Sequence, residues 1–365
     1  MTENELSALL HGITPPDEAA MAAARRRQDS LAKPPRSLGV LEEISVQLAG
    51  ITGHVINTVD RRRIAIFSSD NGVCEEGVAS APQSVTRAQT INFTRHKTGV
   101  SAMAKYMGIE LDVIDVGNLT ELPYALGIRN EKIAAGTHNI AKGPAMTREE
   151  CLRAIGVGVA AARRAKEDGV EVLGIGEMGI GNTSTSSAVL CALTGIAPDD
   201  AVGRGGCITD AMLAHKRDVV KAALEMNRPD KNDPVGVLAA VGGFDLAAMA
   251  GAFLGAAEQR LPVVIDGYIS AVAALAAYRL CPDVRGYLFS SHKSSEAGYT
   301  LAMQEMGMRP YLDLGMRLGE GSGCPLAFSV MQTACIVMAH MATFDEAEIN
   351  DDYLAEVRQE MEIPT

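Results

Sequence analysis

Short apolar runs alternate with longer amphipathic stretches over most of the chain. The runs end in glycine or in polar residues, which is the profile of buried strands in a parallel sheet. They predict strands at 64–70, 111–117, 171–177, 261–268, 285–292 and 309–315. The stretches between them predict helices at 84–107, 147–168, 183–195, 208–226 and 244–259. Strands that alternate with helices favour an α/β fold, a Rossmann-like parallel sheet covered by helices.

The two ends of the chain have a helical pattern without strands. They predict helices at 19–32, at 41–51 and, long and largely buried, at 324–344. The segment KPPRSLG (33–39) separates the first two helices and is as consistent with a simple turn as with a functional loop. We expect the ends to pack together as a smaller helical lobe. The predicted domains are an α/β nucleotide- and base-binding domain over 61–322 and a small helical domain over 1–60 plus 323–365.

The composition narrows the class of protein. A hydrophobic content of 47% in 365 residues is enough to build a core, which excludes intrinsic disorder. The 33 Lys and Arg against 45 Asp and Glu give a net charge of −12, which disfavours a nucleic-acid partner because such binding depends on Lys and Arg contacts with phosphates. There is no charge-free apolar run of about 18 residues and no apolar signal core at the acidic N-terminus. The seven cysteines form no CxxC pair, so we expect reduced thiols in a cytoplasmic enzyme with no membrane partner.

Turns rich in glycine and in polar residues follow several of the predicted strands. The turns read SSDNGVCEEG (68–77), GEMGIGNTST (176–185), DGY (266–268), SSHKSSEAG (290–298) and DLGMRLGEGSG (313–323). The carboxyl ends of parallel strands meet at one edge of a sheet, where ligands bind in open α/β folds. Turns this rich in glycine and hydroxyl groups are hard to explain by packing alone, and they predict a binding cleft at that edge.

Two of the glycine-rich segments are suited to a phosphate. In GEMGIGNTST, backbone N–H groups at a helix N-terminus and the side chains of Asn182, Thr183 and Ser184 offer donors. A second glycine turn (203–206) precedes a helix that carries Lys216. The alternative for GEMGIGNTST is a tight turn that caps a helix without binding a ligand, and the alternative for Lys216 is a lysine in solvent. The alternative for SSHKSSEAG is an ordinary polar loop.

Two glutamates are candidates for acid–base chemistry. Glu320 lies between glycines just before an apolar helix, so desolvation is expected to raise its pKa and make it a base near neutral pH. Glu177 ends the third predicted strand in the same region. A solvated surface glutamate is the alternative for Glu320. Gln89, on the helix after the first strand, faces either the cleft or solvent.

At these residues the sequence resembles the nicotinate-nucleotide:dimethylbenzimidazole phosphoribosyltransferases, which activate the lower ligand of cobamides. The matching blocks are KPPRSLG (33–39), DNGVCEEGV (70–78), GEMGIGNTST (176–185), GRG (203–205), GGFDLAAMAGA (242–252), VVIDGYIS (263–270), SHKSSEAG (291–298), LDLGMRLGEGSG (312–323) and MATFDEA (341–347). They follow the family order from about residue 33 to 347. The resemblance implies that nicotinate mononucleotide gives its phosphoribosyl group to an aromatic base, that nicotinate leaves, and that no cofactor or metal takes part.

The resemblance also implies roles for single residues. Glu320 matches the general base, and Glu177 matches a second carboxylate of the site. The remaining substrate-binding positions implied by the match are Gln89 in the base pocket, Gly179, Asn182, Thr183, Gly205, Lys216 and Ser294 around the phosphate and ribose, and Asp266 and Leu318. The family further implies a dimer with its site near the subunit contact.

The sequence departs from the family pattern at three positions. Arg36 and Asn71 replace a common Gly and a common His, and Ala81 stands where some relatives place a hydroxyl residue near the incoming base. The last change leaves the identity of the base open. A second hypothesis is a subunit of a heterodimeric enzyme that activates phenol or p-cresol and is inactive without its partner. A nicotinamide-dinucleotide dehydrogenase is a third, but it lacks a glycine fingerprint after the first strand.

Overall fold

The core of the protein is one parallel six-stranded sheet, seen in a computed structural model that describes residues 1–361. The strand order is β3-β2-β1-β4-β5-β6, with all neighbours parallel. The strands are β1 (Arg62–Ser69), β2 (Glu110–Gly117), β3 (Arg129–Asn130), β4 (Val172–Met178), β5 (Val263–Ile265) and β6 (Leu288–Phe289). The predicted α/β, Rossmann-like class is confirmed.

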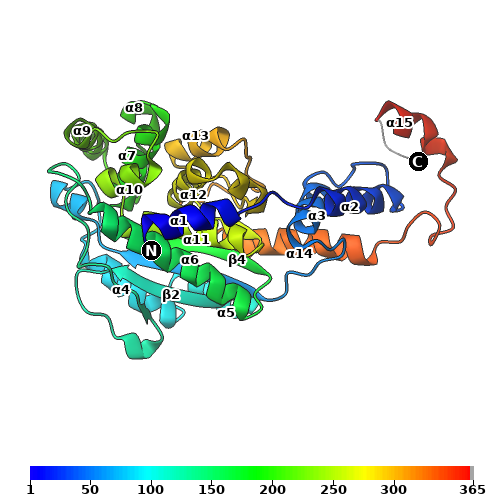
Figure 1. The fold of residues 1–365 in the computed structure, drawn as a ribbon, viewed down its shortest axis with the longest axis horizontal. Coiled ribbons are helices and arrows are strands. Elements are labelled where there is room, and N and C mark those ends of the chain that lie inside the picture. Colours follow the sequence, from blue (N-terminus) through cyan, green and yellow to red (C-terminus); the bar gives the residue numbers. More distant parts are fainter. Residues whose placement is uncertain (362–365) are drawn as a thin grey trace.

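Helices cover both faces of this sheet (Figure 1). One face carries α6 (Arg148–Glu167), α11 (Phe244–Glu258) and α12 (Tyr268–Leu280), and the other carries α4 (Ser84–Thr94), α5 (Gly99–Met107) and α14 (Cys324–His340). Shorter or peripheral helices are α1 (Glu3–Gly12), α7 (Asn182–Thr194), α8 (Pro198–Ala201), α9 (Asp210–Asn227), α10 (Pro234–Val241), α13 (Ala297–Glu305) and α15 (Ala355–Glu360). Thr147 and Glu150 form a capping box at the start of α6.

The sequence-based element boundaries need several corrections. The predicted strand 261–268 shortens to β5, because the chain already begins α12 at Tyr268. The predicted helix 84–107 is two helices, because the chain turns at His96, whose φ is +54°, and Thr98 then caps α5 with its hydroxyl. The predicted strand 309–315 is wrong: the segment only forms an isolated bridge between Leu312 and His292. The predicted strand 285–292 shrinks to β6, because a 3₁₀ turn that starts at Pro282 occupies its first residues.

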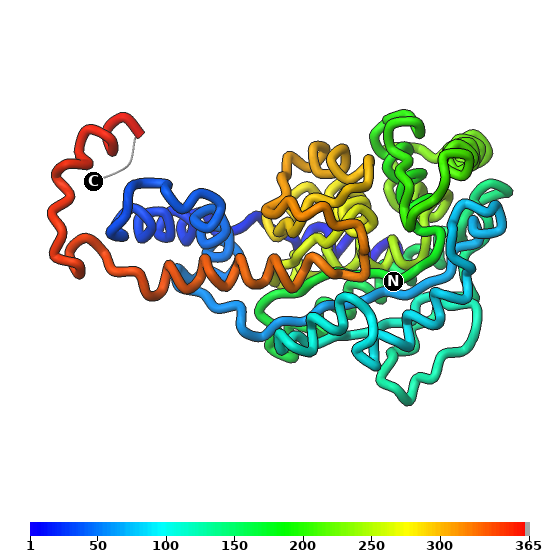
Figure 2. Tube along the Cα trace, turned by 180° about the vertical axis from the view of Figure 1, so that it is seen from behind, coloured from blue at the N-terminus to red at the C-terminus, as the bar shows by residue number. Residues whose placement is uncertain are grey.

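A helical lobe projects from the sheet at one end (Figure 2). It consists of α2 (Glu18–Ser30), α3 (Val40–Thr52) and the end of α14, which share a small apolar cluster of Ala24, Val46, Ala49 and Met338. A buried ion pair joins Lys33 to Glu42 at 2.7 Å across the KPPRSLG turn. Helix α1 packs instead on α11 of the sheet domain. The division of the chain into two domains stays a prediction.

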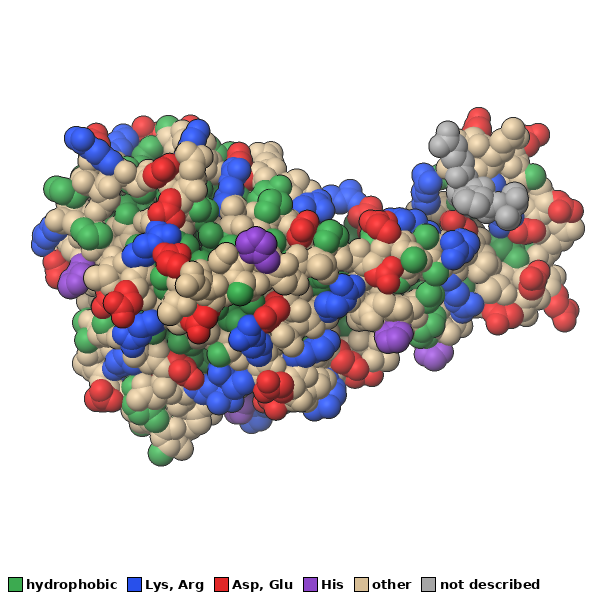
Figure 3. Space-filling view, viewed as in Figure 1, with side chains coloured by type: hydrophobic (Ala, Val, Ile, Leu, Met, Phe, Trp, Pro, Cys, Tyr) green, Lys and Arg blue, Asp and Glu red, His purple; other side chains and the backbone are tan. Residues whose placement is uncertain are grey.

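The surface carries no extended stripe of one charge on the face drawn in Figure 3, where Lys and Arg side chains are interspersed with Asp and Glu. None of the described helices combines the length and the apolarity that a membrane crossing requires. All seven cysteines are free thiols in the structure.

Helices α6 and α11 pack backbone against backbone at glycines. A Cβ atom added at Gly158 would lie 1.8 Å from the carbonyl oxygen of Ala248, and one at Gly251 would lie 2.0 Å from that of Ile155. Real side chains do not tolerate such distances, so only glycine lets the two helices approach this closely. The contact matters for the site because α11 also packs on β1, β2 and β4.

We therefore expect Gly158→Ala to lower the free energy of unfolding by about 1–3 kcal/mol, the usual cost of overpacking a tight contact. Gly12→Ala is the matched control, since a Cβ there meets nothing within 4 Å. Urea denaturation of the two variants checks the comparison. Equal stabilities would show that the α6–α11 contact adapts to the added methyl group.

Candidate active site

The turns at the carboxyl ends of the strands close around one cleft of about 270 Å³. Every residue that the family resemblance assigns to the site lines it, whereas Ser184, the further donor considered from the sequence, is buried outside its lining. The lining residues in question are Gln89, Glu177, Gly179, Asn182, Thr183, Gly205, Lys216, Asp266, Ser294, Leu318 and Glu320. The topology brings them together from α4, α7, α9, the end of β4, the loops after β4, β5 and β6, the loop between α8 and α9, and the loop between α13 and α14.

The loop that carries Glu320 is held in place by Asp266. Its carboxylate accepts the backbone N–H of Gly321 at 2.9 Å and that of Gly323 at 2.6 Å. Asp266 is only 1% exposed, and burial raises its pKa to about 7 in spite of these two donors. Glu320 itself has φ +65°, a left-handed conformation that non-glycine residues rarely adopt. The hydrogen bonds to Asp266 help to hold the loop in this conformation.

The Glu320 side chain faces the cleft beside the start of α5. One carboxylate oxygen, Oε2, accepts the backbone N–H of Val100 at 3.3 Å. The residue is 6% exposed, and burial raises the pKa of its carboxyl while the N–H groups at the helix N-terminus oppose the rise. A carboxylate in this environment is a stronger base than one in water.

Glu177 shares an amide with a second buried carboxylate. The Asn182 side chain donates to Glu177 and, at 3.1 Å, to Asp245 of α11. Glu177 also accepts the backbone N–H of Glu320 at 3.2 Å. Burial raises the pKa of Glu177 to about 8 and that of Asp245 to about 6, because no cation in the described residues lies within ion-pair distance of either group. At neutral pH this group of acids retains protons that it would lose in water.

The opposite part of the cleft is built for an anion. Lys216 is 1% exposed and donates to the Thr183 hydroxyl at 2.7 Å, next to the N-terminus of α7. No described carboxylate lies within 4 Å of its ammonium group, and burial lowers its pKa to about 8. Gly205 has φ +58°, and a Cβ atom at this position would lie 3.3 Å from the Lys216 nitrogen. The absence of a side chain at Gly205 therefore leaves space beside the ammonium group. A helix N-terminus beside an unpaired lysine suits a phosphate.

The third part of the cleft is more apolar. Val85 and Gln89 of α4 line it together with Ala81 and Leu318, and Leu318 is 58% exposed. The Gln89 amide oxygen accepts from Asn92 at 3.0 Å. A flat aromatic ring with one polar edge fits such a lining of aliphatic groups and an amide.

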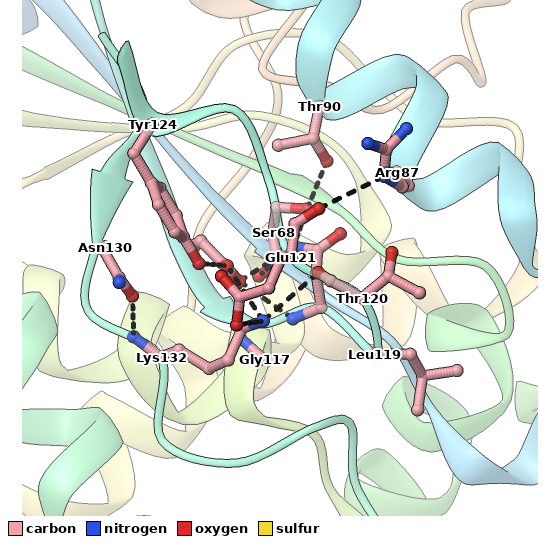
Figure 4. Close-up of polar contacts among 12 residues, drawn as sticks. Ser68, Arg87, Thr90, Gly117, Leu119, Thr120, Glu121, Tyr124, Asn130 and Lys132 are labelled. Carbon is pink, nitrogen blue, oxygen red and sulfur yellow. Dashed lines mark hydrogen bonds and ion pairs between the residues drawn. The ribbon is translucent and has the colours of Figure 1, made fainter. Parts of the chain in front are cut away.

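A chain of hydrogen bonds fixes α4 against the sheet (Figure 4). The Thr90 hydroxyl lies 2.6 Å from that of Ser68 at the end of β1, and Asn118 donates to Ser68 at 3.0 Å and to Asp115 at 2.9 Å. Asp115 in turn accepts the Tyr124 hydroxyl at 2.8 Å. Since Thr90 and Gln89 are neighbours on α4, this buried network also orients the Gln89 side of the helix toward the cleft.

Sequence reasoning does not single out three charged or phenolic groups near the cleft: Asp245, Tyr268 and Glu296. Each lies in a block that carries the family resemblance, GGFDLAAMAGA, VVIDGYIS or SHKSSEAG. The sequence could therefore have pointed to these residues only through their membership of a matching block. Composition gives no indication of which polar residue in a block is buried.

A larger and more open groove of about 850 Å³ lies between α1 and α6, lined in part by Glu5, Arg153 and Arg163. It contains none of the glycine- and hydroxyl-rich turns predicted from the sequence. Among residues 1–361, His, Cys, Asp and Glu side chains do not gather in threes in a way that could hold a metal ion. The buried acids and the buried lysine line the smaller cleft and not this groove.

Comparisons with known proteins agree on one family. The model of a family described as "Phosphoribosyltransferase" matches residues 13–349. A nicotinate-nucleotide–dimethylbenzimidazole phosphoribosyltransferase of Clostridium perfringens (strain ATCC 13124) is 51% identical over 97% of this chain and 98% of its own. The enzyme of the same name from Geobacter sp. (strain M21) is 45% identical over 94% of this chain and 99% of its own. The crystal structure of CobT from Thermus thermophilus superposes with a TM-score of 0.88 at 41% identity, over 91% of this chain and 99% of that one.

The raised pKa of Glu177 has a consequence for stability. In the folded protein this carboxyl has a pKa of about 8, well above the value of about 4.3 in an unfolded chain. Between these two pH values the folded state binds more protons, so the contribution of Glu177 to stability falls as the pH rises. We expect the free energy of unfolding of the wild type to fall relative to that of Glu177→Gln between pH 5 and 8, by at most about 1.4 kcal/mol per pH unit. Urea titrations at a series of pH values measure this difference, and a constant difference would contradict the raised pKa.

Proposed function

The chain belongs to the nicotinate-nucleotide–dimethylbenzimidazole phosphoribosyltransferase family, and from this premise we propose how the residues of its cleft carry out the family reaction. The chain is a pentosyltransferase. It transfers the phosphoribosyl group of nicotinate mononucleotide to 5,6-dimethylbenzimidazole or a related lower-ligand base. The products are nicotinate and the α-riboside 5′-phosphate of the base.

The reaction requires removal of one proton. The bond between C1′ of the ribose and the pyridinium nitrogen breaks, and its electrons neutralise the pyridinium ring. A nitrogen of the incoming base forms the new bond to C1′ from the opposite face. The base thereby becomes positively charged and must lose its N–H proton, while the pyridine ring leaves without help from an acid.

We assign the proton to Glu320. The observation that carries this proposal is that its buried carboxylate, with a raised pKa, lines the same cleft as the apolar surface of Val85, Ala81 and Leu318. A ring lying on that surface would direct an N–H group toward Glu320. A general base with a raised pKa is matched to proton transfer near neutral pH.

The other polar groups of the cleft take up the nucleotide. Lys216, Thr183 and the backbone around Gly179 and Gly205 would bind the phosphate. Glu177 and Asn182 would contact the ribose, and Glu177 would also fix Glu320 through its backbone N–H. Ser294 would also contact the phosphate or the ribose. Asp266 would act on the substrate indirectly, since it positions the loop that carries Glu320.

The names of the relatives favour benzimidazole as the base and give no support to the second hypothesis, a subunit of a phenol-activating heterodimer. We further propose a cytoplasmic homodimer. The exposed Ile336 of α14 and the free thiols are consistent with these two proposals.

The function is tested by incubating the purified chain with nicotinate mononucleotide and a mixture of 5,6-dimethylbenzimidazole, benzimidazole, adenine, phenol and p-cresol. We expect mass spectrometry to detect an N-linked riboside phosphate of a benzimidazole. An O-linked phenolic product would instead assign the chain to the phenol-activating branch. The absence of any product would contradict independent activity of the chain.

The role of Glu320 is tested by Glu320→Gln, which keeps the shape but removes the base. We expect kcat to fall by at least about 100-fold, the usual contribution of a general base, with an unchanged affinity for nicotinate mononucleotide by calorimetry. Glu43→Gln serves as control, because Glu43 is an exposed partner of Arg309 and does not line the cleft. Near-normal turnover by Glu320→Gln would refute the assignment.

A further inference from the structure

Glu296 is a buried acid in the cleft without a partner. It is the N-cap residue of α13, it is 8% exposed, and it lines the cleft together with Ser294 and Lys216. No donor in residues 1–361 forms a hydrogen bond with its Oε2 atom, although that atom is inaccessible to solvent. No cation in the same residues lies within 4 Å of the carboxylate.

The chain makes room for this carboxylate at Gly203. A Cβ atom at that position would lie 2.2 Å from Oε2 of Glu296. The backbone N–H of Glu296 donates to the Ser294 hydroxyl at 3.4 Å, which restrains the turn before α13. The side chain is thus held between the GRG turn and α13 by shape rather than by a hydrogen-bond partner of its own.

An unsatisfied buried carboxylate is costly, and native structures pair such groups with a donor. Oε2 is enclosed by protein, so a ligand in the cleft can donate only to the other carboxylate oxygen, Oε1, which is not enclosed. A phosphate offers only acceptor oxygens and would be repelled, and Lys216 and Thr183 already serve the phosphate. In a cleft that binds a nucleotide, the donors next to the phosphate are the two hydroxyl groups of the ribose.

We propose that Glu296 accepts a hydrogen bond from a ribose hydroxyl of nicotinate mononucleotide and thereby makes the enzyme specific for ribose over deoxyribose. This inference rests on the proposed function and adds a residue to it. A hydrogen bond to a charged acceptor is among the stronger ones, and a site built to accept a hydroxyl rejects the analogue that lacks it, because the buried acceptor is left unpaired. A competing role is that of a counter-ion, since the charge of Glu296 favours the protonated form of Lys216.

The test compares nicotinate mononucleotide with its 2′-deoxy and 3′-deoxy analogues on the wild type and on Glu296→Gln. We expect the wild type to lose at least about 10-fold in kcat/KM on one analogue, as a lost hydrogen bond to a charged group predicts. For Glu296→Gln, kcat/KM on the natural nucleotide should fall by a similar factor. Its kcat/KM on that same analogue should then be little lower than its value on the natural nucleotide. If the loss from the substitution and the loss from the missing hydroxyl multiplied as independent factors, the proposal would be overturned.

A pH series separates the two roles. If Glu296 acts only as the counter-ion of Lys216, Glu296→Gln would shift the pH dependence of KM for the nucleotide and would discriminate against the deoxy analogues as the wild type does. This result would also overturn the proposal. Glu305→Gln is the matched control, because Glu305 is at the other end of α13 and is paired with Arg279. It should match the wild type throughout.

Two further measurements keep the outcomes distinct. Glu296→Asp retains the charge beside Lys216 but withdraws the carboxylate by one methylene, so it should lose the same ribose discrimination even if Glu296→Gln fails to fold. Calorimetric affinities of the three nucleotides report on Glu296 without turnover. A wild type that binds the nucleotides but forms no product would refute the proposed function, while the affinities would still decide the role of Glu296.

Discussion

The two hydrogen bonds from Gly321 and Gly323 to the buried carboxylate of Asp266 hold the centre of the cleft together. They join the loop between α13 and α14 to the end of β5, and that loop places both the backbone and the side chain of Glu320. The Glu320 backbone N–H then reaches Glu177 at the end of β4. Three neighbouring segments of the carboxyl edge are in this way connected through backbone amides. Amides are neutral donors, and no arginine or lysine of residues 1–361 lies within ion-pair distance of Asp266 or Glu177, so burial keeps the pKa values of these two acids high.

The close packing behind the sheet is a condition for this arrangement. Glycines at the α6–α11 contact bring α11 down onto the strands, and α11 supplies Asp245 to the amide of Asn182. On the opposite face, the Thr90–Ser68 hydrogen bond fixes α4 and, with it, Gln89. The cleft is therefore lined by residues whose positions are set by both layers of helices, and its shape depends on packing at some distance from the reacting atoms.

Much of this organisation can be predicted from the sequence, because strand, helix and turn patterns act locally. The parallel sheet and the cleft residues at its carboxyl edge follow from apolar runs that end in glycine-rich turns. The segment 309–315 has apolar residues at alternate positions, as a strand does, yet it forms only an isolated bridge at His292, with backbone hydrogen bonds to Ser291 and Lys293. The break at His96 is set by one positive φ that no composition signals. Sequence patterns do not reveal Glu296 and Asp245 for a related reason: burial of a single acid depends on the neighbours that the fold brings to it, such as Gly203 and Asn182, far away along the chain.

The charge balance of the cleft suits the reaction it would catalyse. Glu177, Asp266, Glu296 and Glu320 line it, with Asp245 behind them. Lys216 is the buried cation at the phosphate end, and the exposed Arg204 and Arg317 also line the cleft. Nicotinate mononucleotide carries a positive pyridinium ring, and positive charge moves onto the ribose as the bond to C1′ breaks. Those acids that are ionised stabilise this charge in a water-poor site more strongly than they would in solution. When the bond breaks, the ring loses its positive charge and keeps its negative carboxylate, so ionised acids nearby favour the departure of nicotinate. A single set of buried carboxylates can thus stabilise the positive charge of the reacting ribose and favour release of the leaving group.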